Sequence, residues 1–123
     1  MLLREKDKQA LIKIFADTKL QVEVWAYGSR INGTAHAGSD LDLVIRSQSL
    51  TPIPPTVYSE LIEKIRDSNI PILVELRDWA KLPESFHKTI SQAHEILYSS
   101  NQNHVNEPLA EYKTKTDKQD QSQ

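Results

Sequence analysis

Residues 28–45 of the chain read GSRINGTAHAGSDLDLVI, and this stretch decides the fold. Two aspartates, Asp40 and Asp42, lie one residue apart at the start of an apolar run that is typical of a β-strand. Because successive side chains of a strand point to opposite faces, both carboxylates share one face, with Cα atoms roughly 6–7 Å apart. Such a pair can bind one divalent ion, or two ions about 3.5–4 Å apart, and therefore predicts metal-assisted phosphoryl chemistry. The opposite, buried face is expected to carry Leu41, Leu43 and Ile45.

The segment before the aspartates predicts a phosphate-binding loop. Residues 20–27 (LQVEVWAY) alternate as in a strand and lead directly into Gly28 and Ser29. Glycine adopts backbone angles closed to other residues and lets a phosphate approach the main chain. Ser29 adds a hydroxyl and is placed to open a short helix, whose free N–H groups and dipole favour anions. Ten residues separate Ser29 from Asp40, which gives the pattern G-S-x10-D-x-D.

This pattern resembles the nucleotidyltransferases of the DNA polymerase beta superfamily, in the form found in the small proteins called minimal nucleotidyltransferases (MNT). The resemblance covers about residues 10–98 and includes residues 71–86, PILVELRDWAKLPESF, which are similar to the third-carboxylate strand and last helix of these proteins. It implies an α/β nucleotidyltransferase (polymerase beta-like) fold, with a mixed sheet flanked by helices. It also implies a site for two Mg²⁺ ions and ATP as the donor.

Composition agrees with this interpretation and excludes some functions. The chain has 123 residues, enough for one domain with a core. With a net charge of −2 and a pI near 6.1, no broad contact with a nucleic-acid backbone is expected, and so no templated polymerisation. The chain has no cysteine, no apolar stretch of membrane-spanning length and no apolar core of a secretory signal near its start. We therefore expect a cytoplasmic protein without membrane contact.

Hydrophobic spacing predicts alternating helices and strands. In chain order, we expect a helix over residues 5–18, strands over 20–27 and 40–45, a loop over 46–55, a helix over 56–68, a strand over 70–77 and a last helix from Pro83 to Tyr98. The last helix is expected to bury Phe86, Ile90, Ala93 and Leu97. Residues 1–98 then form the minimal nucleotidyltransferase domain. The polar residues 99–123 form a tail that we expect to be disordered, or to become ordered on a partner.

Glu75 is the candidate third carboxylate. In its strand, alternate apolar residues share one face, which leaves Glu75 on the other face with Leu73 and Arg77. If this strand lies beside that of Asp40, Glu75 can take a proton from the acceptor hydroxyl or bind the second metal ion. The related proteins mostly carry the shorter aspartate here, so activity is less assured than for the aspartate pair. The alternative is an acid paired with Arg77 or Arg46.

Other residues have two interpretations each. Arg30 contacts a triphosphate oxygen or is a solvated charge, and Ser39 bonds within the loop or to phosphate. Asp78 is expected to cap the turn into the last helix. Core packing is favoured over base stacking for the aromatic residues Trp25, Tyr27 and Trp79. No metal site is expected from the spacing of the histidines, His36, His87, His94 and His104.

The resemblance implies transfer of AMP to a hydroxyl, with Asp40, Asp42 and Glu75 around the metal ions and Gly28 and Ser29 at the β- and γ-phosphates. It leaves three hypotheses for the acceptor. Minimal nucleotidyltransferases are typically encoded beside a helical HEPN-type protein, and the first hypothesis is antitoxin-like adenylylation of such a partner. The second is a small-molecule acceptor bound between two copies of the chain or between chain and partner. The third is a non-catalytic module that binds nucleotide or masks the partner by contact.

Overall fold

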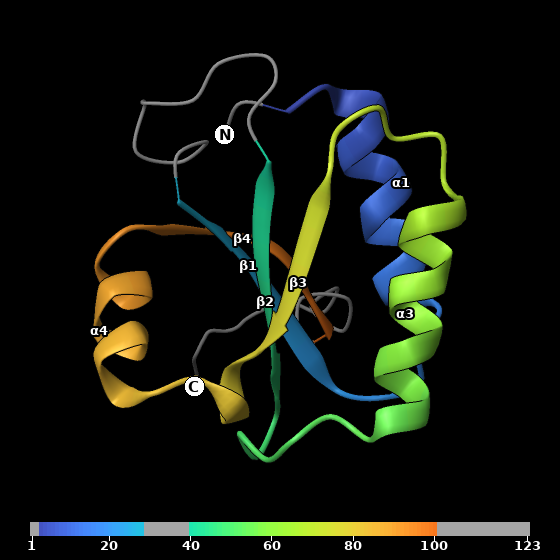
Figure 1. The fold of residues 1–123 in the computed structure, drawn as a ribbon. Helices are drawn as coiled ribbons and strands as arrows, with labels where there is room; N and C mark the ends of the chain where they lie inside the picture. The colour runs from blue at the N-terminus through green and yellow to red at the C-terminus, as the bar shows by residue number, and fades with distance from the viewer. Residues whose placement is uncertain (1–2, 29–39, 101–123) are drawn as a thin grey trace, which may run out of the picture.

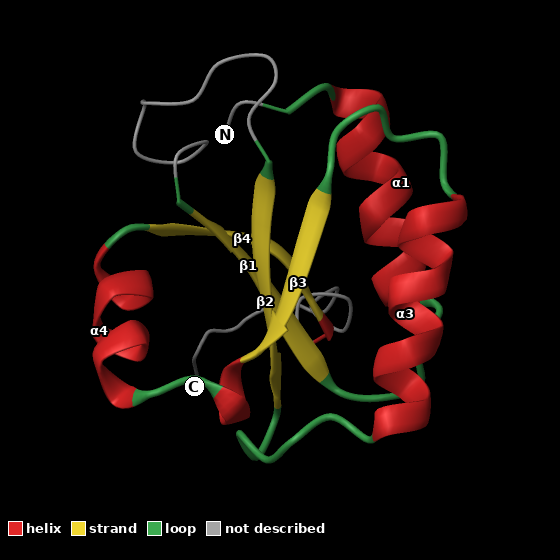
Figure 2. Cartoon of the chain, in the orientation of Figure 1, coloured by secondary structure: helices red, strands yellow, loops and turns green. Residues whose placement is uncertain are grey.

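The computed structural model describes residues 3–28 and 40–100, which form a four-stranded sheet with helices on both faces (Figure 1). Two helices, α1 and α3, lie side by side on one face, and α4 lies on the other (Figure 2). The elements in chain order are α1 (Glu5–Ala16), β1 (Val22–Tyr27), β2 (Leu41–Ser47), α3 (Pro55–Asp67), β3 (Val74–Asp78), the 3₁₀ helix η1 (Trp79–Lys81), α4 (Glu84–Gln92) and β4 (His94–Ser99). The predicted α/β fold with a mixed sheet flanked by helices is confirmed.

The strand order is β3-β2-β1-β4, and the sheet is mixed. β1 pairs antiparallel with both β2 and β4, whereas β2 and β3 are parallel. A parallel pair needs a long crossover connection, and α3 supplies it. The parallel pairing carries the two strands of the predicted site in the same direction, with their first residues at the same end of the sheet.

The face under α1 and α3 holds the larger core. Helical spacing places Leu11 and Phe15 of α1 on the sheet, and both are fully buried. α3 begins at Pro55, whose ring presets the backbone for a first helical turn, and it contributes Leu61 and Ile65. Burying each such side chain contributes about 1.5–3 kcal/mol relative to leaving it exposed. The strands meet these helices with Val22, Val24, Ala26, Leu41, Leu43, Ile45 and Leu76.

A smaller and more aromatic core lies between the sheet and α4. It consists of Trp25, Tyr27, Val44, Trp79 and Ile90. The predicted core positions of Trp25, Tyr27 and Trp79 are thus confirmed. This core covers only part of the face, and the acidic side chains at the start of β2 and β3 stay partly exposed.

The predicted last helix is wrong in its second half. α4 ends at Gln92, and residues 94–99 form an edge strand on β1. A β-bulge opposite Val24 and Trp25 breaks the two-residue alternation, so Leu97 and Tyr98 are both buried in succession. Because the two-residue alternation of a strand is missing from this segment, its sequence resembles a helix, with apolar residues at positions 90, 93 and 97. The segment forms a strand instead of a helix because its backbone then also hydrogen-bonds to N–H and C=O groups of β1 that would otherwise be unpaired. Ala93 ends the helix at the surface and Phe86 is 38% exposed, so neither lies in the core.

Other boundaries differ by a few residues. β2 continues through Arg46 and Ser47, which the sequence interpretation placed in a loop. β3 starts at Val74 instead of Ile70 because Pro71, which has no N–H, interrupts the segment. In the described part of the chain, no helix has both the length and the apolar character needed to cross a membrane.

Candidate active site

Strand register places Asp42, Glu75 and Tyr27 next to one another. Asp42 is the direct partner of Glu75 in the parallel β2–β3 pair and of Tyr27 in the antiparallel β1–β2 pair. All three side chains are on the α4 face, because their strand neighbours Leu41, Leu43 and Leu76 are buried on the other. The structure therefore meets the condition set for Glu75, which was that its strand lie beside that of the aspartates.

Asp40 lies one residue before β2, at the same end of the sheet, and it is exposed. The β-structure of this segment begins with Leu41, whose N–H donates to the carbonyl oxygen of Leu73 at 2.9 Å. Asp40 is close enough for its charge to raise the pKa of Asp42. The two aspartates thus act on each other electrostatically, as the D-x-D spacing indicates.

Gly28 has a backbone φ of +86°, in the left-handed region that glycine adopts without strain. It follows β1 directly and lies against Asp42. A Cβ atom at this position would come within 2.6 Å of Asp42 Oδ2. Glycine is therefore favoured here for a second reason as well, because a side chain would collide with the Asp42 carboxylate. Ser29, Arg30 and Ser39, the other predicted nucleotide-binding residues, lie outside the described residues.

Arg77 is the cation of this cluster. Its Nη1 atom lies 3.1 Å from Glu75 Oε1 and 3.8 Å from Asp42 Oδ1, and it donates a hydrogen bond of 3.3 Å to the Tyr27 hydroxyl. The predicted alternative of a Glu75–Arg77 pair is present, whereas Arg46 pairs with Glu23 at 3.5 Å. Sequence reasoning missed the contacts of Arg77 with Asp42 and Tyr27. The signal available was its position two residues after Glu75, on the same strand face.

The Asp42 carboxyl has a raised pKa. The main cause is burial, since its side chain is only 28% exposed, and the negative charge of Glu75 adds to it. Arg77 opposes the shift, and Asp40 contributes in the same direction as Glu75. The same environment raises the pKa of the Tyr27 hydroxyl, again chiefly through burial. Negative charge at Asp42 is therefore costly until a cation compensates it.

The donor set suits a hard divalent cation such as Mg²⁺, which prefers carboxylate oxygens. Asp42 and Glu75 are adjacent, partly exposed and on one face. However, within residues 3–28 and 40–100 no three histidine, aspartate or glutamate side chains gather closely enough to hold a metal ion. The residue types fit the metal, but in this arrangement a guanidinium contacts two of the three carboxylates.

The other residues weighed from the sequence have structural roles here. Asp78 accepts hydrogen bonds from the N–H groups of Ala80 at 3.1 Å, which caps η1 as predicted, and of Ile53 at 2.9 Å. His87 stacks on Trp79 and His94 on Trp25, each with ring centroids 3.9 Å apart. Arg46 lies over the same two indoles, 4.0 Å from the ring centre of Trp25 and 4.4 Å from that of Trp79. His36 and His104 lie outside the described residues.

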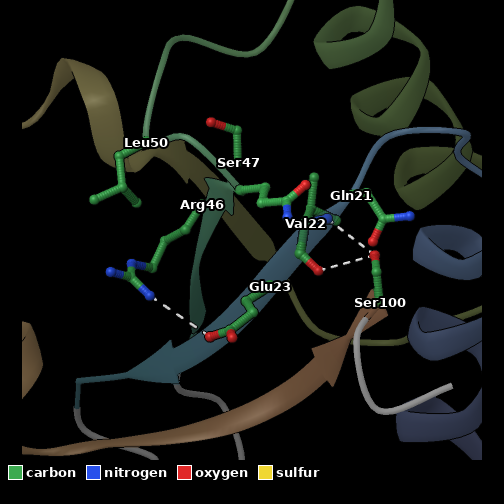
Figure 3. A pocket seen from close by; sticks show the side chains of 8 residues that line it. Gln21, Val22, Glu23, Arg46, Ser47, Leu50 and Ser100 are labelled. Carbon is green, nitrogen blue, oxygen red and sulfur yellow. Dashed lines mark hydrogen bonds and ion pairs between the residues drawn. The ribbon is translucent and has the colours of Figure 1, made fainter. Parts of the chain in front are cut away.

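A cavity of about 180 Å³ opens at the far end of β1 and β2 (Figure 3). Val22 and Ser47 are direct partners there, five positions along the register from Tyr27 and Asp42, or roughly 16 Å at the rise of a strand. Some polar groups of this cavity are already paired, although Arg46 Nε is buried without a hydrogen-bond partner among the described residues. Figure 3 shows Arg46 paired with Glu23, and the Ser100 hydroxyl bonded to both backbone groups of Val22. We therefore do not assign the chemistry to this cavity.

Comparison with known proteins identifies the family of the chain. Residues 9–103 match the family model described as polymerase beta, nucleotidyltransferase. A relative named "Probable protein adenylyltransferase MntA", from Haemophilus influenzae, is 38% identical over 74 residues, which are 60% of this chain and 63% of the relative. The matched segment thus spans less than two thirds of that relative's length.

Three solved structures share the fold. One is a toxin-antitoxin crystal structure with AMP-PNP (24% identity, TM-score 0.56, 78% of this chain and 76% of the other). A second is the toxin-antitoxin MntA-HepT (15%, 0.58, 81% and 76%). The third is a tri-AMPylated Shewanella oneidensis HEPN toxin in complex with MNT antitoxin (19%, 0.53, 80% and 75%). At these identities the likeness shows the fold alone.

Proposed function

Because the chain belongs to the polymerase beta nucleotidyltransferase family, we propose that it transfers AMP from ATP to a hydroxyl group of a HEPN-type partner protein, as the antitoxin of a toxin-antitoxin pair. The observation that carries this proposal is the register that sets Asp42 beside Glu75, next to Gly28. Support for the protein acceptor comes from the names of the relatives, which include a protein adenylyltransferase and complexes of an MNT antitoxin with a HEPN toxin. Use of ATP favours a cytoplasmic location.

In this proposal the carboxylates serve as metal ligands. Asp40 and Asp42 would hold two Mg²⁺ ions, and Glu75 would bind the second ion or accept the proton of the acceptor hydroxyl. The chemistry that bound ions would supply there is neutralisation of charge on the triphosphate and on the leaving pyrophosphate. Gly28 and Ser29 hold the β- and γ-phosphates through backbone N–H groups and a hydroxyl, with Arg30 and Ser39 as further phosphate contacts.

The reaction is an in-line displacement. The acceptor oxygen forms a bond to the α-phosphorus of ATP, the bond from that phosphorus to the β-phosphate oxygen breaks, and pyrophosphate leaves. The hydroxyl proton passes to Glu75 or to water. The protein's contribution is positioning and preorganised charge, which is the usual way that phosphoryl-type transfers are accelerated. The folded domain carries this chemistry. Of the tail expected from residue 99 onward, Ser99 ends β4 and Ser100 bonds to Val22, so we propose that the remaining residues, 101–123, contact the partner.

Incubation with ATP labelled on the α-phosphate tests the proposal, with the chain alone, with the expected HEPN-type partner protein, and with Asp42→Asn as the inactive control. The expected result is Mg²⁺-dependent label on the partner only when the unsubstituted chain is present. Label on a small molecule from a cell extract, with none on the partner, would instead support the small-molecule acceptor.

The contact of Arg77 with two carboxylates favours one further candidate, a non-catalytic module that binds nucleotide or masks its partner. A module of this kind would form the complex and protect cells from the toxin equally well with and without the Asp42→Asn substitution. Toxin protection that is lost in Asp42→Asn, together with an unchanged complex by light scattering, would exclude it. Light scattering of the chain alone also determines whether it forms homo-oligomers.

A further inference from the structure

Arg77 lies where a cation bridging the two carboxylates would lie. One nitrogen, Nη1, is 3.1 Å from Glu75 and 3.8 Å from Asp42, and the Tyr27 hydroxyl holds the same nitrogen at 3.3 Å. The Arg77 side chain comes from β3, two residues after Glu75 on the same face of the sheet. A single guanidinium therefore lies against two of the three acids that the proposed metal site uses.

We propose that Arg77 is a built-in counter-cation that competes with the divalent metal for Asp42 and Glu75. This inference rests on the proposed metal site. In the resting protein, Arg77 offsets the repulsion between the two carboxylates. Metal loading requires the guanidinium to turn away, so Arg77 lowers the affinity of the site for the metal. Arg77 is in this sense a positioning residue, because it acts on the reaction through the carboxylates.

The contacts of Arg77 are suited to such an exchange. Its side chain is 42% exposed and that of Glu75 is 40% exposed, so the pair is partly solvated and weak compared with a buried one. The 3.8 Å contact to Asp42 is long for a charge-assisted hydrogen bond. A divalent ion carries twice the charge and binds both carboxylates directly. The inference also explains how Glu75 can be an ion-pair partner in one state and a metal ligand in another.

The test is metal binding by the full chain without nucleotide, measured as free Mn²⁺ by electron paramagnetic resonance. Arg77→Met removes the charge but keeps an aliphatic stem. We expect it to bind Mn²⁺ about tenfold more tightly than the parent, because a unit charge a few ångströms from a divalent ion repels it appreciably even at the dielectric constant of water. Arg77→Lys keeps the charge and is expected to stay within about threefold of the parent.

The matched control is Arg66→Met, which removes the same charge from an exposed position on α3, on the other face of the sheet. It is expected to leave Mn²⁺ affinity unchanged. In a Glu75→Gln background, the gain from Arg77→Met should shrink, since one of the two shared acids is gone. Thermal melts by circular dichroism verify that each variant is folded, and Arg77→Gln replaces Arg77→Met if the latter is not.

Unchanged or weaker Mn²⁺ binding by both neutral Arg77 variants would overturn the inference, as would an equal gain in Arg66→Met, which would indicate a general charge effect. If the parent binds Mn²⁺ in a manner that Asp42→Asn abolishes, the metal site stands and only the role of Arg77 fails. If neither the parent nor the variants bind Mn²⁺ saturably, the proposed metal site fails with it.

Discussion

The two faces of the sheet differ in what their side chains do. On the face toward α1 and α3, β2 presents Leu41, Leu43 and Ile45, all fully buried. On the face toward α4, the alternate residues of the same strand are Asp42, Val44 and Arg46, of which only Val44 belongs to a core. One strand therefore contributes stability through one face and carries the proposed site on the other. This separation lets the acidic cluster exist, because its electrostatic cost is offset by packing on the opposite face.

The largest effect is expected from a substitution on the face toward α4, which carries the proposed site. Asp42→Asn removes one carboxylate from the proposed metal site, and nucleotide transfer should fall by about 10³-fold or more, given that metal ions contribute several kcal/mol to such reactions. The fold should stay intact, since the substitution leaves the α1 and α3 core untouched. Transfer rates with labelled ATP and circular dichroism measure the two parts. Equal rates for variant and parent would contradict the catalytic assignment.

The next residue, Leu43, allows the opposite test, in which a substitution changes the core and leaves the carboxylates in place. Leu43→Ala opens a cavity in the larger core and should destabilise the protein by about 2–5 kcal/mol. Transfer per folded molecule should stay near that of the parent, because Leu43 points away from the carboxylates. Urea unfolding gives the free energy, and activity is measured at low temperature where the variant is folded. A large loss of activity in the folded fraction would mean that the two faces are not independent.

Glu75 gives a smaller effect that separates its two interpretations. Glu75→Gln should reduce turnover by about 10²-fold if Glu75 is a base or a metal ligand. A residue that only pairs with Arg77 would leave turnover nearly unchanged and lower stability modestly, by about 1 kcal/mol or less. Steady-state kinetics and urea unfolding on the same preparation distinguish these outcomes.

Gly28→Ala tests the junction between β1 and the carboxylates. A left-handed φ costs a non-glycine residue about 1–2 kcal/mol, and the new Cβ would force the Asp42 carboxylate to move. We therefore expect a loss of about 1–2 kcal/mol in unfolding free energy together with weaker Mn²⁺ binding. Loss of stability without any change in metal binding would show that Gly28 serves only the turn.

The smallest effect concerns pH and contrasts one aspartate from each face. The pKa of Asp42 is raised, mainly by burial, whereas the hydrogen bond from Arg4 lowers the pKa of Asp7 on α1. A group whose pKa is raised on folding stabilises the protein below the unfolded pKa of 3.8, and this stabilisation is lost as the pH rises. A group whose pKa is lowered on folding stabilises the protein above 3.8, and this stabilisation is lost as the pH falls. With EDTA at pH 7, Asp42→Asn should therefore stabilise the protein, by about 1 kcal/mol or less.

Asp7→Asn is the matched control for this measurement and should destabilise the protein at pH 7. The difference between Asp42→Asn and the parent should narrow as the pH falls toward 3.8, whereas the difference between Asp7→Asn and the parent should narrow only as the pH falls below 3.8, through the lowered pKa of Asp7. Urea unfolding at pH 7 and at acidic pH measures them. If Asp42→Asn destabilises the protein at pH 7, the ion pair with Arg77 outweighs burial and the repulsion from Glu75 and Asp40.

The sequence by itself determined the features that depend on neighbouring residues. The alternation of β2 assigns Asp42 to one face and Leu43 to the other, because side-chain direction in a strand is a local property. The helical spacing of Leu11 and Phe15 likewise predicts α1 and its buried face. The left-handed conformation of Gly28 follows from the missing side chain and its place after a strand.

Only the tertiary structure decided which strands are neighbours and in what register. The contacts of Asp42 with Glu75 and Arg77 join segments that are far apart in the sequence, so no local pattern specifies them. For the same reason residues 94–99 were predicted as helix, since their strand form depends on the open edge of β1 and on a bulge that hides the alternation. Local patterns set the direction of each side chain, whereas pairing between distant segments sets which side chains meet.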